Sequence, residues 1–298
     1  MSNPSTSEEA VPGLVVVDKP SGWTSHDVVG RGRKLAGTRK VGHAGTLDPM
    51  ATGVLLLGIG RATRLLGQLQ LTDKEYVATI RLGRSTVTDD AEGEVLEDVA
   101  AGHVTREQVE AAMVPLRGTI QQVPSAVSAI KVDGQRSYAR VRAGEQVALE
   151  SREVTVDDLS ITDLRVEGEV VDVDVHVACT SGTYVRALAR DLGAALGVGG
   201  HLTMLRRTRV GPFTLDHAAT IDELAEQWRV ISLDDATRIA FDSYDLSEAE
   251  AADVMFGRTL TGIDLGAPGT VAVFDPTGRF LALYEQRGGT ARPVAVFV

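Results

Sequence analysis

Asp48 is the residue whose surroundings best suit chemistry. It lies in the segment VGHAGTLDPMATG, residues 41–53, where three glycines allow close backbone approach and Pro49 biases Asp48 toward an extended conformation. A carboxylate held out from such a loop can serve as a nucleophile, a general base or a metal ligand. An Asp-Pro pair also forms ordinary turns for conformational reasons alone. The segment by itself leaves both interpretations open.

Three further side chains suggest a function, and each has a plainer explanation. His43 suits a base or a stacking ring, but a lone loop histidine is commonly an incidental polar residue. Tyr76 begins an alternating strand pattern, where a tyrosine is commonly part of the core. Arg186 falls in the first turn of a predicted helix, where the helix dipole disfavours a cation. Arg186 therefore calls for an anionic neighbour, such as a buried carboxylate.

The sequence lacks the signatures of the common cofactor enzymes and hydrolases. It has no Gly-x-Ser-x-Gly element, zinc signature, kinase set or complete dinucleotide fingerprint. Its single cysteine, Cys179, has no disulfide partner within the chain, which fits a reducing compartment. The sequence has no stretch of signal-peptide type and no apolar run long enough to span a bilayer. We therefore expect a cytoplasmic protein without metal, cofactor or membrane contact.

A net charge of −11 argues against a nucleic-acid partner, because phosphate binding depends on clustered Lys and Arg. The basic residues are nevertheless clustered, while acids concentrate in residues 89–98. An RNA-facing surface can thus be positive on a protein that is negative overall, although ordinary solvated faces explain the same clusters. The clusters that are candidates for phosphate contacts are Arg31, Arg33, Lys34, Arg39 and Lys40; Lys131, Arg136, Arg140 and Arg142; and Arg206, Arg207 and Arg209.

The elements before residue 60 are predicted to hold Asp48 in place. Residues 14–17 form a β-branched run that predicts a strand, and Thr24 or Ser25 can cap a helix that follows it. Residues 42–53 indicate an irregular Gly-rich loop, and the apolar run after them predicts a buried strand. We therefore expect Asp48 on a loop between rigid elements, where catalytic residues often lie.

Tyr76 and Arg186 are predicted to lie at the starts of two later elements. Residues 75–82 alternate as a strand with Tyr76 facing inward, and residues 170–178 alternate as a second strand. The helix after the second strand carries Arg186 in its first turn. Residues 124–147 have weak periodicity and predict a long, mobile excursion that suits a clamp.

After about residue 240 the pattern changes to a small β-rich module. Ser247 and Glu250 predict a capped short helix, and the turn residues 275–278 predict a hairpin. Strands and helices mix without a βαβ repeat, which predicts an α+β fold with a mixed, largely antiparallel sheet. The expected units are a disordered tail at residues 1–11, a catalytic domain at residues 12–242 and a small β-rich domain at residues 243–298.

Three segments taken together resemble a known family. They are DKPSGWTSH at residues 18–26, GHAGTLDPMATG at residues 42–53 and SGTYVR at residues 181–186. In this order they are similar to the bacterial TruB family of tRNA pseudouridine-55 synthases. The resemblance implies a cofactor-free isomerase that acts on a uridine in the T-loop of tRNA. It also implies a pseudouridine synthase core that carries a C-terminal PUA-like RNA-binding domain.

The resemblance implies a role for each candidate residue. Asp48 is similar to the family's catalytic aspartate, and Arg186 to the arginine that pairs with it. Tyr76 resembles the ring that stacks on the target uracil and receives its C5 proton, while His43 resembles the residue that takes the flipped base's place. The implied pocket residues are Tyr184 and Leu205, and the implied supports of the Asp48 loop are Lys19 and Pro20.

The sequence leaves the chemical route open. Asp48 can attack the base, attack the ribose C1′ or remove the ribose 2′ proton, and all three routes use an anion that Arg186 would favour. One rival function is a non-catalytic tRNA-binding or folding chaperone. The other is a glycosidic hydrolase, which usually needs a second carboxylate, and no obvious partner acid accompanies Asp48. The expected partner is the T-arm of tRNA, bound by a monomer.

Overall fold

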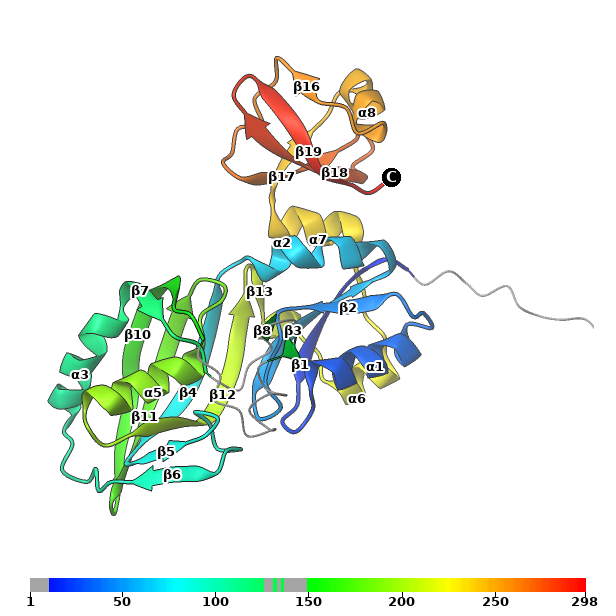
Figure 1. The fold of residues 1–298 in the computed structure, drawn as a ribbon. Helices are drawn as coiled ribbons and strands as arrows, with labels where there is room; N and C mark the ends of the chain where they lie inside the picture. The colour runs from blue at the N-terminus through cyan, green and yellow to red at the C-terminus, as the bar shows by residue number, and fades with distance from the viewer. Residues whose placement is uncertain (1–10, 126–130, 133–134, 137–148) are drawn as a thin grey trace, which may run out of the picture.

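A ten-stranded sheet forms the centre of the larger part of the molecule (Figure 1). The computed structural model describes residues 11–125, 131–132, 135–136 and 149–298. In chain order the strands of this sheet are β1 (Gly13–Lys19), β2 (Val41–Ala44), β3 (Thr52–Ile59), β4 (Lys74–Leu82), β7 (Gly118–Gln122), β10 (Arg152–Glu167), β11 (Val170–Cys179), β12 (Gly200–Val210), β13 (Phe213–Thr214) and β14 (Ile231–Ser232). Their order across the sheet is β14-β1-β3-β12-β4-β11-β10-β7, with β2 beside β3 and β13 beside β12.

The sheet is mixed but largely antiparallel, which confirms the predicted class. Its strand pairs are antiparallel except for β3 and β12, where Gly53 lies beside Arg207. Gly53 has a φ of 100°, and a Cβ there would lie 2.1 Å from the Arg207 carbonyl oxygen, so only glycine fits this crossing. The crossing places the end of the Asp48 loop in the middle of the sheet.

Two helices of the larger part, those with Ser25 and Arg186 in their first turns, begin where the sequence predicts. The helices of this part are α1 (Ser25–Leu35), α2 (Leu66–Gln70), α3 (Arg106–Met113), α5 (Val185–Ala195), α6 (Ile221–Glu226) and α7 (Leu233–Ala240). The Thr24 side chain accepts a hydrogen bond from the Asp27 backbone N–H, and the Asp27 carboxylate accepts one from the Thr24 backbone N–H, so Thr24 is the predicted cap. α5 packs on β12 and carries Arg186 as its second residue.

The segment before β3 is more regular than the sequence indicates. Residues 42–53 are predicted as an irregular loop, but β2 pairs with β3 and places His43 opposite Leu57. The strand is four residues long and consists largely of small residues, so its own pattern is weak and the long strand β3 determines its pairing. The loop that carries Asp48 is therefore shorter than predicted and spans residues 45–51.

Two short hairpins stand outside the main sheet. β5 (Arg84–Thr86) pairs with β6 (Val95–Asp98), and the connection between them contains most of the acidic block. β8 (Lys131–Val132) pairs with β9 (Gln135–Arg136). The predicted excursion at residues 124–147 lies mostly outside the described residues, and so do the side chains of its basic cluster.

The C-terminal module is β-rich, as predicted. Its five-stranded sheet has the order β15-β17-β18-β19-β16, and α8 (Glu248–Met255) lies beside it. These strands are β15 (Asp242–Asp245), β16 (Leu260–Thr261), β17 (Thr270–Phe274), β18 (Phe280–Arg287) and β19 (Thr290–Val296). The predicted cap by Ser247 with Glu250 and the predicted hairpin of β17 and β18 are both present.

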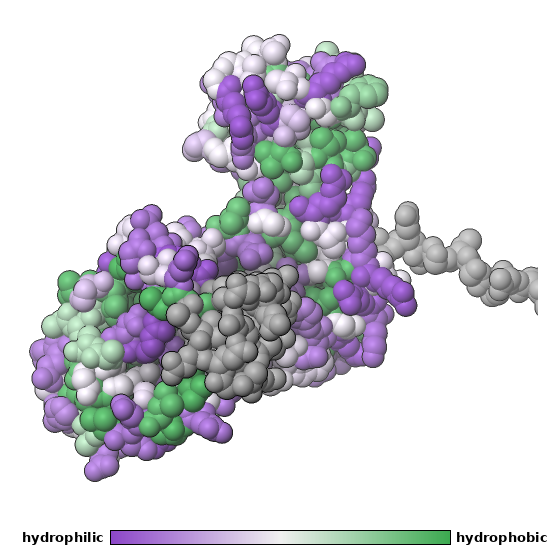
Figure 2. All heavy atoms as spheres, in the orientation of Figure 1, coloured by the Kyte–Doolittle hydropathy of each residue, from purple (hydrophilic) through white to green (hydrophobic). Residues whose placement is uncertain are grey.

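An apolar cluster joins the module to the rest of the chain. Phe274, Phe280 and Phe297 share this cluster with Leu14 and Leu56 of the main sheet. The Arg61 guanidinium also donates a hydrogen bond to the Phe297 carbonyl at 2.9 Å. Figure 2 shows hydrophobic residues at this junction.

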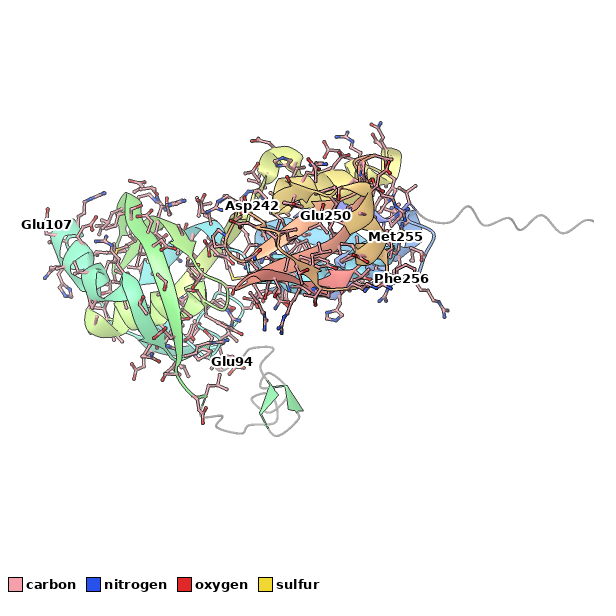
Figure 3. All side chains as sticks on the ribbon, turned by 90° about the horizontal axis from the view of Figure 1, so that it is seen from above. Glu94, Glu107, Asp242, Glu250, Met255 and Phe256 are labelled. Carbon is pink, nitrogen blue, oxygen red and sulfur yellow. The ribbon has the colours of Figure 1, made fainter. Side chains whose placement is uncertain are left out.

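Four large apolar side chains of the module are exposed among the described residues: Met255, Phe256, Val294 and Val298. Phe256 is 77% exposed at the end of α8, beside Met255 (Figure 3).

Among the described residues no helix is both long and apolar enough to cross a membrane.

Candidate active site

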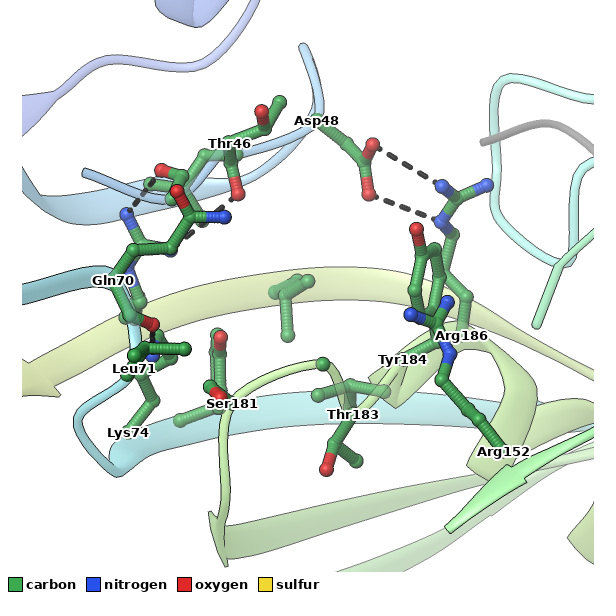
Figure 4. Close-up of a pocket in the computed structure, with 17 residues that line it drawn as sticks. Thr46, Asp48, Gln70, Leu71, Lys74, Arg152, Ser181, Thr183, Tyr184 and Arg186 are labelled. Atoms are coloured by element: carbon green, nitrogen blue, oxygen red, sulfur yellow. Dashed lines mark hydrogen bonds and ion pairs between the residues drawn. The ribbon is translucent and has the colours of Figure 1, made fainter. Parts of the chain in front are cut away.

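A cavity of about 410 Å³ opens beside the loop that carries Asp48 (Figure 4). Its size falls within the range of roughly 300–1,000 Å³ that is typical of small-ligand sites. The lining comes from the Asp48 loop, the start of β4, the turn before α5, the first residue of β10 and the middle of β12. The sequence candidates that line it together are Asp48, Tyr76, Tyr184, Arg186 and Leu205.

Lys19 supports the Asp48 loop from the end of β1. Its ammonium donates hydrogen bonds to the carbonyl oxygens of Pro20 at 2.8 Å, Trp23 at 2.6 Å and Pro49 at 3.2 Å. The Lys19 side chain is fully buried, and burial lowers its pKa to about 8, although the charge of Asp48 opposes this shift. Pro20 is exposed and contributes its carbonyl oxygen. Lys19 and Pro20 thus lie behind the loop and do not line the cavity.

Ser25 and Arg207 hold the same loop from two sides. The Ser25 hydroxyl accepts a hydrogen bond from the Leu47 N–H at 2.9 Å and donates one to the Leu47 carbonyl at 3.1 Å. Arg207 is 1% exposed and donates to the carbonyls of Val54 at 2.8 Å and Gly45 at 3.2 Å. Because these contacts fix the backbone on both sides of Asp48, its carboxylate has a defined position.

Asp48 and Arg186 form a two-point ion pair at the cavity wall (Figure 4). Nε of Arg186 lies 3.0 Å from Oδ2 of Asp48, and Nη2 donates to Oδ1 at 3.2 Å. The side chain of Arg186 is 5% exposed, whereas 34% of the Asp48 side chain is open to the cavity. Asp48 therefore provides the anionic neighbour that the position of Arg186 in α5 predicts.

A second carboxylate lies on the other side of Arg186. Oδ2 of Asp90 is 3.4 Å from Nη1 of Arg186, and the Asp90 side chain is 4% exposed. The Glu92 N–H donates to Asp90 Oδ1 at 3.1 Å. This finding corrects the expectation that no acid accompanies Asp48, because the connection between β5 and β6 brings Asp90 to the site.

The described residues contain no group of three or more His, Cys, Asp or Glu that could hold a metal ion.

The surroundings change the acidity of Asp48 and Tyr76. Burial raises the pKa of the Asp48 carboxyl above its ordinary value, the charge of Arg186 opposes this shift, and the charge of Asp90 adds to it. Burial also raises the pKa of Tyr76, which is 7% exposed on β4, while Arg207 opposes the rise. Tyr76 therefore keeps its proton at neutral pH. Asp48 loses its proton at a higher pH than an exposed aspartate does.

A buried glutamine places Tyr184. Gln122 at the end of β7 is 1% exposed, its Nε2 donates to the Tyr184 carbonyl at 3.1 Å, and its Oε1 accepts from the Tyr184 N–H at 2.8 Å. This pair of bonds holds the start of α5, which has no side-chain cap. Leu205, 6% exposed on β12, supplies an apolar part of the cavity wall.

His43 does not line the cavity. It stands on β2, and its ring meets the His26 ring edge-on at 5.7 Å between centroids. Its Nδ1 is buried and has no hydrogen-bond partner among the described residues. Burial lowers the pKa of His43.

The basic cluster at residues 206–209 has internal partners. Arg206 contacts both carboxylate oxygens of Asp18 at 3.0 and 2.7 Å, and Arg209 contacts Glu75 at 2.8 Å. Arg207 is 1% exposed and donates to backbone carbonyls, so its donors already have partners and the predicted phosphate contact lacks support. The reason is that β12 is an interior strand, where alternate side chains enter opposite faces of the sheet.

Sequence reasoning missed Asp90, Gln122 and the structural role of Arg207. Asp90 belongs to an acidic block that has the pattern of a solvated surface, and Gln122 ends a short strand with no motif around it. Arg207 belongs to a basic cluster in the sequence, and that cluster indicated an exposed surface. Each of these residues acquires its role through partners on distant elements.

Family comparisons cover the chain from residue 33 to its end. Residues 33–185 match the model described as TruB family pseudouridylate synthase (N terminal domain). Residues 186–241 match a tRNA pseudouridylate synthase B C-terminal domain, and residues 241–298 match tRNA Pseudouridine synthase II, C terminal.

Curated relatives match along nearly the whole chain. A tRNA pseudouridine synthase B of Thermobifida fusca is 59% identical over 96% of this chain and 98% of that protein. Its counterpart from Nocardia farcinica is 58% identical over 99% of this chain and 96% of that protein.

The fold is similar to solved structures, and the sequence places the chain in a family. A chain of a Cbf5-Nop10-Gar1 complex matches with a TM-score of 0.74 and 27% identity, over 97% of this chain and 86% of that one. An archaeal Nop10-Cbf5 complex contains a chain that matches with a TM-score of 0.71 and 25% identity, over 99% and 89%. With its segments, its sheet and these matches in agreement, the chain belongs to the TruB family of pseudouridylate synthases, which are isomerases.

Proposed function

We propose that the chain converts uridine 55 in the T-loop of tRNA to pseudouridine, with Asp48 as the catalytic carboxylate and without a cofactor. The observation that carries this proposal is the Asp48–Arg186 ion pair at the wall of a base-sized cavity that Tyr76 also lines. The relatives named tRNA pseudouridine synthase B support tRNA as the substrate. The resemblance of residues 42–53 to the family motif supports the T-loop position.

The reaction is an isomerisation that balances without water or a co-reactant. The bond between N1 and C1′ breaks, the bond between C5 and C1′ forms, C5 loses a proton and N1 gains one. The uracil must first leave the base stack, at a cost of roughly a few kcal/mol that stacking on an aromatic ring offsets. Because its raised pKa keeps Tyr76 protonated, Tyr76 suits stacking better than it suits accepting the C5 proton.

Asp48 acts as an anion in each of the three routes that the sequence leaves open. The two-point contact with Arg186 orients both carboxylate oxygens, and this contact is stronger for the ionised form. Asp90 lies behind Arg186, is 4% exposed and does not line the cavity, so it does not face a water molecule held there. The site therefore favours isomerisation over hydrolysis of the glycosidic bond.

The basic face of α1 suits the phosphates of the T-arm. Arg31 and Lys34 line a second cleft of about 710 Å³, whose lining also includes the carboxylates of Asp27 and Asp222. Free cationic side chains supply the electrostatic part of RNA binding. None of the cluster Arg31, Arg33, Lys34, Arg39 and Lys40 forms an ion pair with a described acid.

The proposal divides the work between two domains of a cytoplasmic monomer. Residues 12–242 carry catalysis, with His43 in the place of the flipped base, and residues 243–298 form a PUA-like RNA-binding domain. The separate five-stranded sheet and the family match that begins at residue 241 support this boundary.

The test is the isosteric variant Asp48→Asn, with Asp98→Asn as the matched control on an exposed strand. We expect Asp48→Asn to bind tRNA transcripts with an affinity within about threefold of the unaltered protein and to form no pseudouridine, because amide and carboxylate occupy the same space. Pseudouridine mapping along the whole transcript reports the position that is modified. An active Asp48→Asn variant refutes the catalytic assignment, and modification elsewhere refutes the T-loop assignment. Release of free uracil would indicate a hydrolase, and binding without modification by the unaltered protein a chaperone.

A further inference from the structure

Arg152 is the first residue of β10 and lies on the cavity wall beside Tyr184 (Figure 4). Its guanidinium carbon is 4.8 Å from the centroid of the Tyr184 ring, which is a cation–π distance. In the sheet Arg152 lies opposite Gln122, the residue that holds the Tyr184 backbone. Arg152 and Tyr184 are therefore positioned by the same strand pair.

Two donors of Arg152 are unused. Its Nε and Nη2 atoms are buried and have no hydrogen-bond partner among the described residues. Buried guanidinium donors without acceptors carry a free-energy cost, and native structures seldom retain them without a reason. An acceptor that arrives with the substrate would supply that reason.

The other cations of the cavity wall are already engaged. Arg186 is paired with Asp48, and Arg207 donates to backbone carbonyls. The Lys74 ammonium donates to the Gln70 carbonyl at 2.8 Å. In the part of the chain that the structure describes, Arg152 thus differs from these three because its donors remain available.

We propose that Arg152 binds a backbone phosphate of the RNA next to the flipped uridine. This proposal rests on the proposed function. A guanidinium offers two parallel N–H donors that match two phosphate oxygens. Because base, ribose and phosphate are contiguous, a nucleotide whose base lies against Asp48 and Tyr76 keeps its phosphate near the cavity lining. Arg152 breaks no ion pair with a described residue when it turns toward that phosphate, and the contact it gives up is the cation–π contact with Tyr184.

The experiment combines a variant with a modified substrate. Arg152→Met keeps the apolar stem over Tyr184 but removes the hydrogen-bond donors. Arg152→Lys keeps the positive charge but loses the two parallel N–H donors of the guanidinium. The substrates are tRNAs ligated from synthetic T-arm strands that carry a neutral methylphosphonate either 5′ or 3′ of the target uridine. Single-turnover pseudouridine formation gives kcat/KM for each combination of protein variant and tRNA substrate. Arg165→Met removes one positive charge from the same strand outside the cavity and serves as the control.

We expect Arg152→Met to lower kcat/KM by about 10- to 100-fold, as for loss of hydrogen bonds to a charged group, and Arg165→Met to have little effect. With the unaltered protein, the methylphosphonate at one of the two positions should lower kcat/KM by a similar factor. With Arg152→Met, the same methylphosphonate should lower kcat/KM by less than about twofold, because the variant has already lost the contact. An unchanged kcat/KM in Arg152→Met overturns the proposal. The proposal also fails if, at both methylphosphonate positions, the loss from the variant and the loss from the substrate multiply. If Arg152→Met does not fold, the same coupling is read from Arg152→Lys. If the unaltered protein does not modify native tRNA, the proposed function has failed instead.

Discussion

Replacing Arg186 by lysine keeps a positive charge but removes the planar fork that holds Asp48. Arg186 contacts the two oxygens of Asp48 at 3.0 and 3.2 Å and donates to the Thr88 carbonyl at 2.8 Å. A single ammonium nitrogen cannot reach all three acceptors from the same backbone position. Hydrogen bonds to charged groups contribute about 1.5–3 kcal/mol each, so losing one or two of them predicts a rate about 10- to 10⁴-fold lower.

The assay is single-turnover release of tritium from tRNA labelled at C5 of uridine, since C5 loses its proton in the reaction. Arg190→Lys is the matched control, because Arg190 lies one turn further along α5 and pairs with Asp89 at 3.4 Å without contacting Asp48. We expect the control to keep its rate within about threefold of the unaltered protein. Thermal unfolding of both variants verifies that they remain folded.

Two results would refute the reasoning. The first is an Arg186→Lys protein whose single-turnover rate is close to that of the unaltered protein, since the fork would then contribute nothing to Asp48. The second is an equal loss in Arg186→Lys and Arg190→Lys, which would show that any change on this face of α5 impairs the enzyme.

Three further outcomes follow from the contacts around the site and the module. Asp90→Asn removes a negative charge that helps to raise the pKa of Asp48, so the anion persists to lower pH. The acid limb of the pH–rate profile should therefore move to lower pH, and an unmoved or higher limb contradicts the assignment. Lys19→Met removes the three hydrogen bonds that the buried ammonium donates to the carbonyls of Pro20, Trp23 and Pro49, and should lower the free energy of unfolding in urea by about 2–4 kcal/mol. A loss below about 1 kcal/mol would show that the loop is held by other contacts. Phe297→Ala empties a buried site between the module and the sheet and should cost about 3–5 kcal/mol in the same measurement, whereas a neutral effect argues against a shared core.

Local elements were predictable because their signals are local. The Thr24 cap, the strand that carries Tyr76 and the hairpin of the module each depend on neighbouring residues, and the structure contains all three. The strand at residues 41–44 was missed because its pairing with β3, and not its own residues, makes it extended.

The charge pattern was the least reliable guide. The arginines at residues 206–209 form a basic cluster in the sequence, yet their strand lies inside the sheet, where Asp18 and Glu75 neutralise two of them and Arg207 is buried. On α1, Arg31, Arg33 and Lys34 form no ion pair with a described acid, and Arg33 donates only to the Val41 carbonyl of β2 at 3.5 Å.

The sequence by itself determined which residue types surround Asp48 and which family they resemble. Only the tertiary structure decided that Asp48 shares Arg186 with Asp90, that Gln122 holds Tyr184, and that two Arg152 donors find no partner in the described part of the chain. The physical reason is that strand order and register bring these side chains together across large separations in the chain. Periodicity and propensity report the backbone near a residue, whereas contact partners depend on which strands become neighbours.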